Sequence, residues 1–431
     1  MIPIDPHLLV RAGAIYITTL AMMALWVWRR PSRQFVAGGM LAAAWNVPVV
    51  LGLHLLALRW GWWNFDAQGG LFLGMPVDLF AAWVALWSIV PALAFPASHP
   101  FVPAAFALAL DLVLMPIAAP VIQLGPYWLV GEALGVLVGV LPGQLLARWT
   151  AGDSHVRARA ALQALAFSGL LLFVLPAIAI EGSGSPWINP SARPNWQLSL
   201  IVQLLAGVGL LGLTAVQEFA ERGRGTPVPF DPPKTIVTTG IYSYVRNPMQ
   251  LSAVLLLLIL GAVLANWWVA ASALVAHVYS AGLAGWDEDQ DLRDRFGEDW
   301  MAYRRGVRAW VPGFRPWHLP ATSPAQLYVS EECAMCSEVG RWFQARGARH
   351  LDIVPAEHHA TPLTRIAYES EDGKYRASGI VAISRALEHI HLGWALIGFA
   401  CRLPIVASFV QLLADASGAQ PRRISASTPH H

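Results

Sequence analysis

The sequence predicts an all-α, multi-pass membrane protein that ends in a smaller α/β domain. Of its 431 residues, 56% are hydrophobic and 13% are charged, whereas about 25% of the residues of soluble proteins are charged. Apolar windows long enough to cross a bilayer recur through the first two thirds of the chain. A polar segment with strand and helix patterns follows from Leu327. The formal net charge of +2, without a basic stripe, argues against a nucleic-acid partner.

About nine apolar windows are predicted to be transmembrane helices. The last two are joined at Asn266 with almost no loop, which predicts a tight helical hairpin. The windows lie near residues 8–28, 36–58, 77–95, 101–123, 128–147, 160–180, 196–217, 250–265 and 267–284.

Basic residues after the first, fifth and seventh windows predict the orientation of the chain. If each window crosses once, all three clusters lie on one side, which the positive-inside rule assigns to the cytoplasm. We therefore expect a multi-pass protein of the inner membrane whose N-terminus is outside and whose C-terminal domain is cytoplasmic. The clusters are Arg29, Arg30 and Arg33, then Arg148, Arg157 and Arg159, then Arg222, Arg224, Lys234 and Arg246.

Three domains are predicted, of which the first carries an internal repeat. Residues 62–83 overlay residues 128–149 at a constant offset of 66, which indicates a duplicated helical membrane domain over residues 1–185. A second membrane segment is expected over residues 186–315. A Pro-rich linker then leads to a soluble domain over residues 325–418. The paired positions of the repeat include Trp62, Pro76 and Trp83, which recur as Trp128, Pro142 and Trp149.

Two polar motifs bracket the predicted hairpin. "GIYSYVRNPMQLS" (240–252) precedes it and "WDEDQDLRDRFGEDWMAYRRG" (286–306) follows it. Together they resemble the membrane methyltransferase superfamily of isoprenylcysteine carboxyl methyltransferase and phosphatidylethanolamine N-methyltransferase, over residues 196–313. The matching residues are Gly240, Tyr242, Arg246, Asn247 and Pro248, then Glu288, Asp289, Leu292, Phe296, Gly297, Trp300 and Tyr303.

This resemblance implies that S-adenosylmethionine is the cofactor and that the acceptor is small or lipophilic. Arg246 would pair with the cofactor's carboxylate, and Glu288 or Asp289 with its ammonium group. Methyl transfer then depends on the alignment of the acceptor with the sulfonium. Catalytic roles are implied for Arg246, Glu288 and Tyr242. Cofactor binding is implied for Gly240, Tyr244, Arg246, Asn247, Pro248, Glu288, Asp289 and Tyr303. The structural alternative makes Arg246 a membrane anchor and the tyrosines an aromatic belt.

Four acidic residues lie in or near the first six windows, where a carboxyl group is costly unless it has partners. The segment around Asp66 and Asp78 weakly resembles lycopene cyclase-type membrane enzymes. A buried acid such as Asp111 could protonate an alkene, as an acid-driven terpenoid or carotenoid cyclase or isomerase requires. The alternative is that Asp66 and Glu132 lie at the outer interface, that Asp78 caps its helix and that Asp111 bonds to a neighbouring helix. The four candidates are Asp66, Asp78, Asp111 and Glu132.

The C-terminal segment reads as a strand, a Cys-x-x-Cys pair, a helix over residues 336–345 and a second strand. This order is typical of a thioredoxin-like opening, and residues 325–415 resemble the small DCC-type thiol–disulfide oxidoreductases. A helix N-terminus favours a thiolate at Cys333, while the neighbouring Glu331 and Glu332 oppose it. Cys333 and Cys336 are therefore redox candidates with a thiol–disulfide partner, or part of a docking module without redox chemistry. No metal site is predicted.

The sequence thus favours methylation of a lipid or lipophilic acceptor at the cytoplasmic membrane face. Two other classes stay open, an acid-driven cyclase or isomerase and a lipid-binding membrane scaffold without enzymatic activity.

Overall fold

The computed structural model describes residues 5–226, 228, 231–320 and 322–422, without the side chains of residues 283–288. The chain divides into two compact units. One contains Met1–Leu198, Gly225–Pro232 and Leu257–Ser272, and the other contains Ser199–Arg224, Pro233–Leu256 and Ala273–His431.

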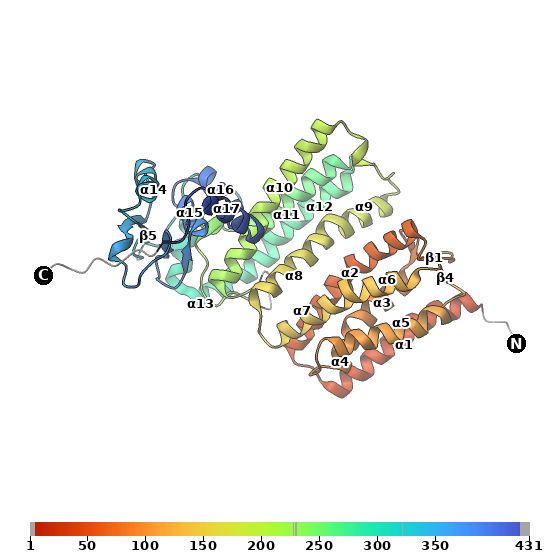
Figure 1. Ribbon diagram of the computed structural model, residues 1–431. Helices are drawn as coiled ribbons and strands as arrows, with labels where there is room; N and C mark the ends of the chain where they lie inside the picture. The colour runs from red at the N-terminus through yellow and green to blue at the C-terminus, as the bar shows by residue number, and fades with distance from the viewer. Residues whose placement is uncertain (1–4, 227, 229–230, 321, 423–431) are drawn as a thin grey trace. The chain divides into compact units, whose positions relative to one another are not determined.

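The first unit is a set of mainly long apolar helices (Figure 1). Its helices are α1 (Pro6–Arg29), α2 (Arg33–Trp60), α3 (Val77–Trp87), α4 (Ile89–Ala94), α5 (Phe101–Ile117), α6 (Trp128–Gly135), α7 (Leu141–Ala151), α8 (Val156–Gly169) and α9 (Leu175–Ser183). A π-helical turn at Val136–Val140 joins α6 to α7, and another at Leu170–Val174 joins α8 to α9. Pro142 and Pro176 are the second residues after these turns. Since proline has no N–H and clashes with the preceding turn, it accounts for the wider turn at both places.

Two short two-stranded sheets also belong to the first unit. β1 (Trp63–Phe65) pairs antiparallel with β4 (Ile122–Leu124), and β2 (Leu71–Phe72) with β3 (Met75–Pro76). The first halves of the two sequence repeats therefore differ in structure, because residues 62–76 form strands and turns while residues 128–142 are helical. Their second halves are both helical, in α3 and α7.

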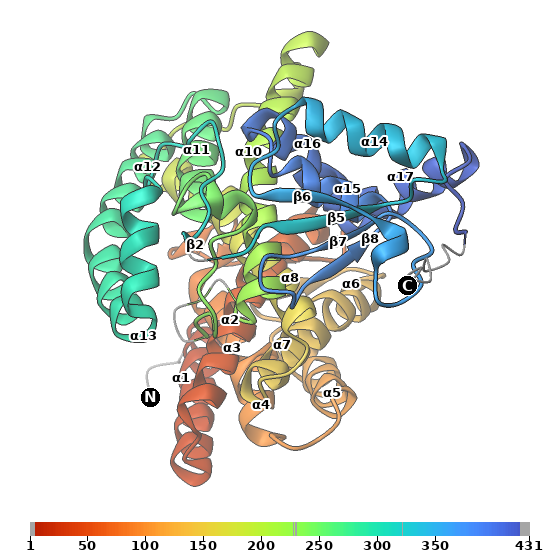
Figure 2. The ribbon, with the colours of Figure 1, turned by 90° about the vertical axis from the view of Figure 1, so that its left-hand side faces the viewer.

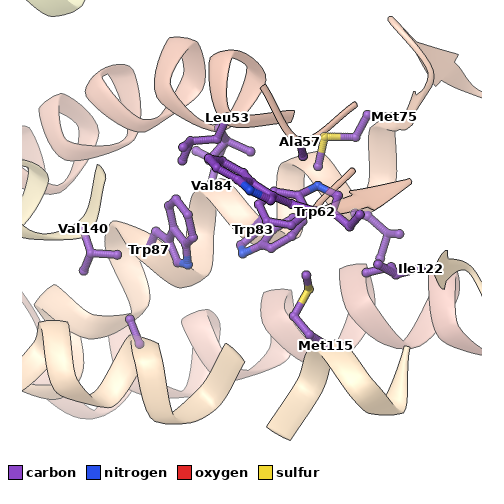
Figure 3. Packing of buried hydrophobic residues seen from close by; sticks show 14 of the residues in the cluster. Leu53, Ala57, Trp62, Met75, Trp83, Val84, Trp87, Met115, Ile122 and Val140 are labelled. Atoms are coloured by element: carbon purple, nitrogen blue, oxygen red, sulfur yellow. The ribbon is translucent and has the colours of Figure 1, made fainter. Parts of the chain in front are cut away.

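The core of the first unit is built around tryptophans (Figure 3). Trp62, Trp63, Trp83 and Trp87 are buried and follow one another at ring-centroid distances of 5.8–6.0 Å. Glycines of α6 make room for them: a Cβ at Gly131 would lie 2.3 Å from the ring of Trp63. Close packing of this kind fixes α6 against the loop before α3.

Six helices of the described residues are long and apolar enough to cross a membrane. They are Pro6–Arg29, Arg33–Trp60, Val77–Ala94, Trp128–Ala151, Val156–Ser183 and Asn195–Gly223. One predicted span is shorter than expected, since α5 has only 17 residues. α11 (Pro248–Val263) has the 16 residues of its window, and α12 (Trp267–Tyr279) continues into a π-helical turn that ends at Ala284. At about 1.5 Å per residue, α5 covers roughly 26 Å of a bilayer core of about 30 Å. Pro116 and Pro120 flank its end and stop the helix.

The hairpin between the two motifs consists of α11 and α12. Residues 264–266 join them, and Asn266 caps α12 by accepting a hydrogen bond from the backbone N–H of Val269 at 3.0 Å. A Cβ at Gly261 would lie 2.6 Å from the backbone of Ala270, so the glycine allows the two helices to touch. The predicted tight connection at Asn266 is confirmed.

Residues Leu257–Ser272 of this hairpin belong to the first unit, and the rest of α11 and α12 belongs to the second. The second unit also contains α10 (Asn195–Glu218), except for its first four residues, and α13 (Gly285–Gly306). A π-helical turn at Phe219–Gly223 extends α10, and another at Ser280–Ala284 precedes α13. α13 is broken at Gly297, whose φ of 51° and ψ of −121° suit glycine.

The C-terminal segment of the second unit forms a four-stranded sheet in the order β6-β5-β7-β8 (Figure 2). β5 (Ala325–Val329) runs parallel to β6 (Leu351–Pro355), as the crossover through α14 (Ala334–Ala345) requires. β7 (Ala367–Glu369) and β8 (Arg376–Ser378) add antiparallel strands. The helices α15 (Ile380–Leu387), α16 (Leu392–Arg402) and α17 (Pro404–Ala416) follow. The strand, helix and strand expected from residue 327 onward are present.

One hydrophobic core joins the segment around the motifs to the C-terminal helices. Tyr242, Tyr244 and Trp300 share a buried cluster with Ala395 and Phe399 of α16. Trp317 of the Pro-rich segment packs against this core, its backbone N–H bonded to Ser243 O at 2.9 Å. The predicted segments 186–315 and 325–418 thus fold largely into one unit.

Candidate active site

A cavity of about 190 Å³ in the second unit lies between the two motifs. Its walls come from the end of α10, the segment before α11, the turn after α12, and α13. The lining residues are Phe219, Pro233, Ile236, Val237, Tyr242, Arg246, Asn247, Ser280, Ala281, Asp289, Leu292, Phe296, Trp300, Tyr303, Arg304, Ala309 and Trp310.

The first motif is held in place by a tight turn. Gly240–Ser243 form one turn of 3₁₀-helix that begins with Gly240 at φ +62°. A Cβ on this residue would lie 2.8 Å from the carboxyl carbon of Glu218, so glycine is required by both conformation and space. The backbone N–H groups of Arg246 and Asn247 then bond to the carbonyls of Arg308 and Ala309 at 2.9 and 3.1 Å. These two bonds fix the first motif beside the end of the second.

Aromatic rings form much of the cavity wall. The buried hydroxyl of Tyr303 donates to the backbone carbonyl of Tyr242 at 2.9 Å. The Trp300 ring lies 5.8 Å from that of Tyr303, and the Phe219 ring lies 5.8 Å from that of Tyr242. Such faces can accept a purine or a cationic sulfur centre.

The charged groups of the cavity are organised around Asp289. Its carboxylate accepts from the Trp300 indole at 3.0 Å and contacts the guanidinium groups of Arg293 at 2.8 Å and Arg304 at 3.0 Å. Arg246 donates to the carbonyl of Arg304 at 3.1 Å, and its guanidinium carbon lies 5.7 Å from the centre of the Trp300 ring. Charges of both signs therefore meet at one wall of the cavity.

The structure brings most of the predicted site residues together and places the others elsewhere. Tyr242, Arg246, Asn247, Asp289 and Tyr303 line the cavity, and the side chain of Glu288 lies outside the described residues. The lining does not include Gly240, Tyr244 or Pro248.

Tyr244 has a different setting from the other predicted site residues. Its buried hydroxyl donates to the backbone carbonyl of Glu388 at 2.7 Å. Burial raises the pKa of Tyr244, and the nearby Glu388 adds to the effect. This tyrosine therefore stays neutral and bonds to the C-terminal segment.

Sequence reasoning missed Arg304, Phe219 and Trp310 in the cavity wall. Arg304 directly follows Tyr303 of the second motif, so a wider reading of that motif would have found it. Phe219 and Trp310 lie outside both motifs and carry no local signal.

A buried cluster of charges next to the first motif was also missed. Glu218 at the end of α10 contacts Arg385 at 2.6 Å and Arg402 at 3.3 Å. Arg385 further contacts Glu221 at 3.1 Å, and Arg402 contacts Glu388 at 2.7 Å. The side chain of Thr239 donates to Glu218. This ion cluster links the segment before Gly240 to α15 and α16.

The four N-terminal acids are in three different settings. Asp66 is exposed, and Asp78 forms an ion pair of 2.7 Å with Arg11. Asp111 and Glu132 are buried and interact with each other, and the Trp87 indole donates to Asp111 at 2.6 Å. Only the last two could act as a pair.

The two cysteines of the Cys-x-x-Cys pair meet at the start of α14. Cys333 caps the helix, and its sulfur accepts hydrogen bonds from the backbone N–H of Cys336 at 3.4 Å and from the Cys336 thiol at 2.7 Å. The bond from the Cys336 thiol is the main reason why the pKa of Cys333 is lowered, and backbone N–H groups help. Burial raises the pKa of Cys336 to about 12. A cavity of about 360 Å³ adjoins both residues.

Within the described residues, no group of three or more His, Cys, Asp or Glu side chains is arranged to hold a metal ion.

Comparison with known proteins adds one finding. The sequence model of the phospholipid methyltransferase family matches residues 197–299, which include α10, the first motif, the hairpin and most of α13. Neither a curated protein nor a solved structure matches the chain. The apolar helices indicate a membrane protein, and the similarity of residues 197–299 to phospholipid methyltransferases supports a membrane methyltransferase.

Proposed function

We propose that the chain is an S-adenosylmethionine-dependent methyltransferase that acts on a lipid or other lipophilic acceptor at the cytoplasmic face of the membrane. One observation carries the proposal. Two motifs about 40 residues apart in the sequence line a single cavity, and most of that cavity's wall lies in the segment similar to phospholipid methyltransferases.

The residues of the cavity suit the cofactor. S-adenosylmethionine has a carboxylate, an ammonium group and a purine, and when bound it supplies a methyl group carried on a sulfonium. We assign the carboxylate to Arg246. The ammonium is assigned to the acidic start of α13, with Asp289 in the described part and Glu288 beside it. The rings of Tyr242, Trp300 and Tyr303 offer faces for the remaining groups.

The contribution of the protein to the reaction is positioning. The Tyr303 hydroxyl is bonded to the backbone carbonyl of Tyr242, so the Tyr303 ring is held in place. Asp289 holds Arg304 and Trp300 by direct contacts. A rigid wall of this kind lowers the entropy lost when acceptor and methyl donor align. The lining of largely apolar side chains also excludes water from the methyl group.

Cofactor binding by variants tests the proposal. Arg246→Ala removes a charge-assisted contact of about 1.5–3 kcal/mol and should weaken binding roughly ten- to a hundredfold. Arg305→Ala is the matched control, because Arg305 is exposed on α13 and does not line the cavity. Calorimetry on the purified chain gives the affinity, and transfer of labelled methyl into extracted lipids gives the activity. Equal affinity in wild type and Arg246→Ala would refute the assignment.

The cysteine pair supports a second, separate activity. We propose that the C-terminal segment is thioredoxin-like and exchanges thiols and disulfides with a partner. In this step the Cys333 thiolate attacks one sulfur of a partner disulfide, which forms a mixed disulfide and releases the other partner sulfur as a thiolate. The Cys336 thiol then attacks the Cys333 sulfur and releases the remaining partner sulfur, which takes up the Cys336 proton. The Cys333–Cys336 pair ends as a disulfide and the partner is reduced. The low pKa of Cys333 and the high pKa of Cys336 favour this division of roles.

A further inference from the structure

Helix α17 has an apolar face that the described residues of the second unit leave largely uncovered. Ile405, Phe409, Leu412 and Leu413 are 50–86% exposed. Their spacing of four, three and one residues puts them on one side of the helix. Asp415 is the one charged residue of α17, and it is paired with Arg365. An exposed apolar stripe of this kind marks an interaction surface.

The opposite side of α17 is fixed to the rest of the segment. Gln411 accepts a hydrogen bond from the backbone N–H of Ile380 at 2.8 Å. Gln411 and Ala414 also line the cavity next to Cys333 and Cys336. The helix therefore cannot turn its apolar side inward without losing these contacts.

The start of α17 is anchored at the end of a predicted membrane span. Arg402, two residues before α17, is buried against Glu218 at 3.3 Å, and its backbone carbonyl accepts from Gln217 at 3.4 Å. Both partners belong to the candidate span Asn195–Gly223. Exposed apolar residues of this span extend to Leu213, and charged residues begin at Glu218. The boundary between lipid and water thus lies close to the level of Arg402.

α17 turns sharply away from α16 at this point. It is bent by 92° from α16, and the two helices together are apolar enough to resemble a broken span. Helices that lie in a membrane surface carry an apolar stripe on one side and polar contacts on the other. We propose that α17 lies on the bilayer surface, with Ile405, Phe409, Leu412 and Leu413 inserted between the lipids. The cavity of the cysteine pair would then be held at the membrane surface.

The test uses the full chain in lipid nanodiscs. Cys333, Cys336 and Cys401 are replaced by Ser, and a spin label is attached to Ile405→Cys or Phe409→Cys. The control is Gln344→Cys on α14, which is an exposed position of the same segment. Oxygen concentrates in lipid, whereas a nickel chelate stays in water, so their relaxation effects report the depth of each label. All three positions are on the surface, and the substitutions should leave folding intact.

We expect severalfold lower accessibility to the nickel chelate and higher accessibility to oxygen at positions 405 and 409 than at position 344. Equal exposure to the nickel chelate at all three positions would overturn the proposal. Dilution with unlabelled protein tests whether a second copy of the chain, and not lipid, covers the apolar face of α17. If protection at 405 and 409 comes with spin–spin coupling that dilution removes, the apolar face binds another copy and the proposal is wrong.

Discussion

Cys333 and Cys336 are three positions apart, yet their pKa values are shifted in opposite directions. The cause is the different surroundings of the two thiols. Cys333 stands at the N-terminus of α14 and accepts hydrogen bonds, while Cys336 is half-buried and donates one. The neighbouring Glu331 and Glu332 were expected to oppose a thiolate at Cys333. The local hydrogen bonds outweigh them, since the pKa of Cys333 is lowered. A hydrogen bond acts at contact distance, whereas exposed charges are screened by water.

Alkylation should separate the two thiols. Because the thiolate is the reactive form, Cys333 should react with iodoacetamide at pH values below the ordinary thiol range of about 8.5. Cys336 should react only in strongly alkaline buffer, in keeping with its pKa of about 12. Mass spectrometry of peptides after timed alkylation measures both rates. Cys336→Ala removes the hydrogen bond to Cys333 and should raise the pKa of Cys333. Equal rates for both cysteines in the wild type would contradict this account.

Asp111 and Glu132 form a buried pair whose role is either structural or catalytic. Substitution of Asp111 distinguishes the two roles. We propose that Asp111 is structural, because its carboxylate accepts from the Trp87 indole inside the tryptophan core. Asp111→Ala should lower the free energy of unfolding by about 1–3 kcal/mol, since the indole loses its acceptor. Asp111→Asn should lower the free energy of unfolding by less than Asp111→Ala does. Asp66→Asn, at an exposed position, should change it little. Thermal unfolding in detergent measures this. If instead Asp111→Asn leaves stability unchanged and abolishes conversion of a polyene, the acid-driven alternative is correct.

At the scale of elements, the ion cluster at the end of α10 connects three helices that are far apart in the sequence. All four charged groups are buried, with exposed fractions of 0–6%: Glu218, Arg385, Glu388 and Arg402. A buried charge must have partners, because its desolvation is costly. The cluster therefore holds α10, α15 and α16 in one arrangement. Since Glu218 also touches Gly240 and Thr239, it fixes the start of the first motif.

Removal of one partner from this cluster should be strongly destabilising. Arg402→Met leaves Glu218 and Glu388 with fewer counter-charges in a buried site, and we expect a loss of about 3–5 kcal/mol. Asp291→Asn is the control, because its ion pair with Arg295 is at the surface and should contribute about 0–1 kcal/mol. Unfolding of both variants in the same detergent measures the difference. Similar losses for the two variants would show that the cluster contributes no more than a surface pair.

At the scale of the whole molecule, the placement of basic residues gives a topology to test. Arg29, Arg30 and Arg33 follow α1, and Arg148 and Arg157 lie at the junction of α7 and α8. The positive-inside rule assigns these junctions to the cytoplasm. The third basic cluster, which includes Arg222 and Lys234, precedes the first motif. By the same rule we propose that the methyltransferase cavity is reached from the cytoplasm.

Labelling with a membrane-impermeant maleimide checks this topology in sealed right-side-out vesicles. The reporters are single cysteines introduced as Gln344→Cys, in the C-terminal segment, and Ser191→Cys, in the loop after α9. We expect Ser191→Cys to react at once and Gln344→Cys to react only after the vesicles are opened. The reverse pattern would place the cavity and the cysteine pair outside.

The sequence by itself determined the features that depend on local composition and spacing. Six of the apolar windows form helices long enough to cross a membrane, and Asn266 joins the hairpin as predicted. Both motifs could be found because each occupies a short continuous segment. For the same reason the sequence predicted Arg246 and Asp289 as site residues, and both line the cavity. The hydropathy window overestimated the length of α5, because mean hydropathy does not show where prolines end a helix.

Only the tertiary structure decided which of these residues share a site. Tyr244 belongs to the same motif as Tyr242, yet it bonds to Glu388 and not to the cavity. Asp66 and Glu132 occupy equivalent places in the repeat, yet one is exposed and the other buried. Glu218 and Arg402 are distant in the sequence and meet in the ion cluster. Partners of this kind are chosen by packing between distant segments, which no local pattern of residues records.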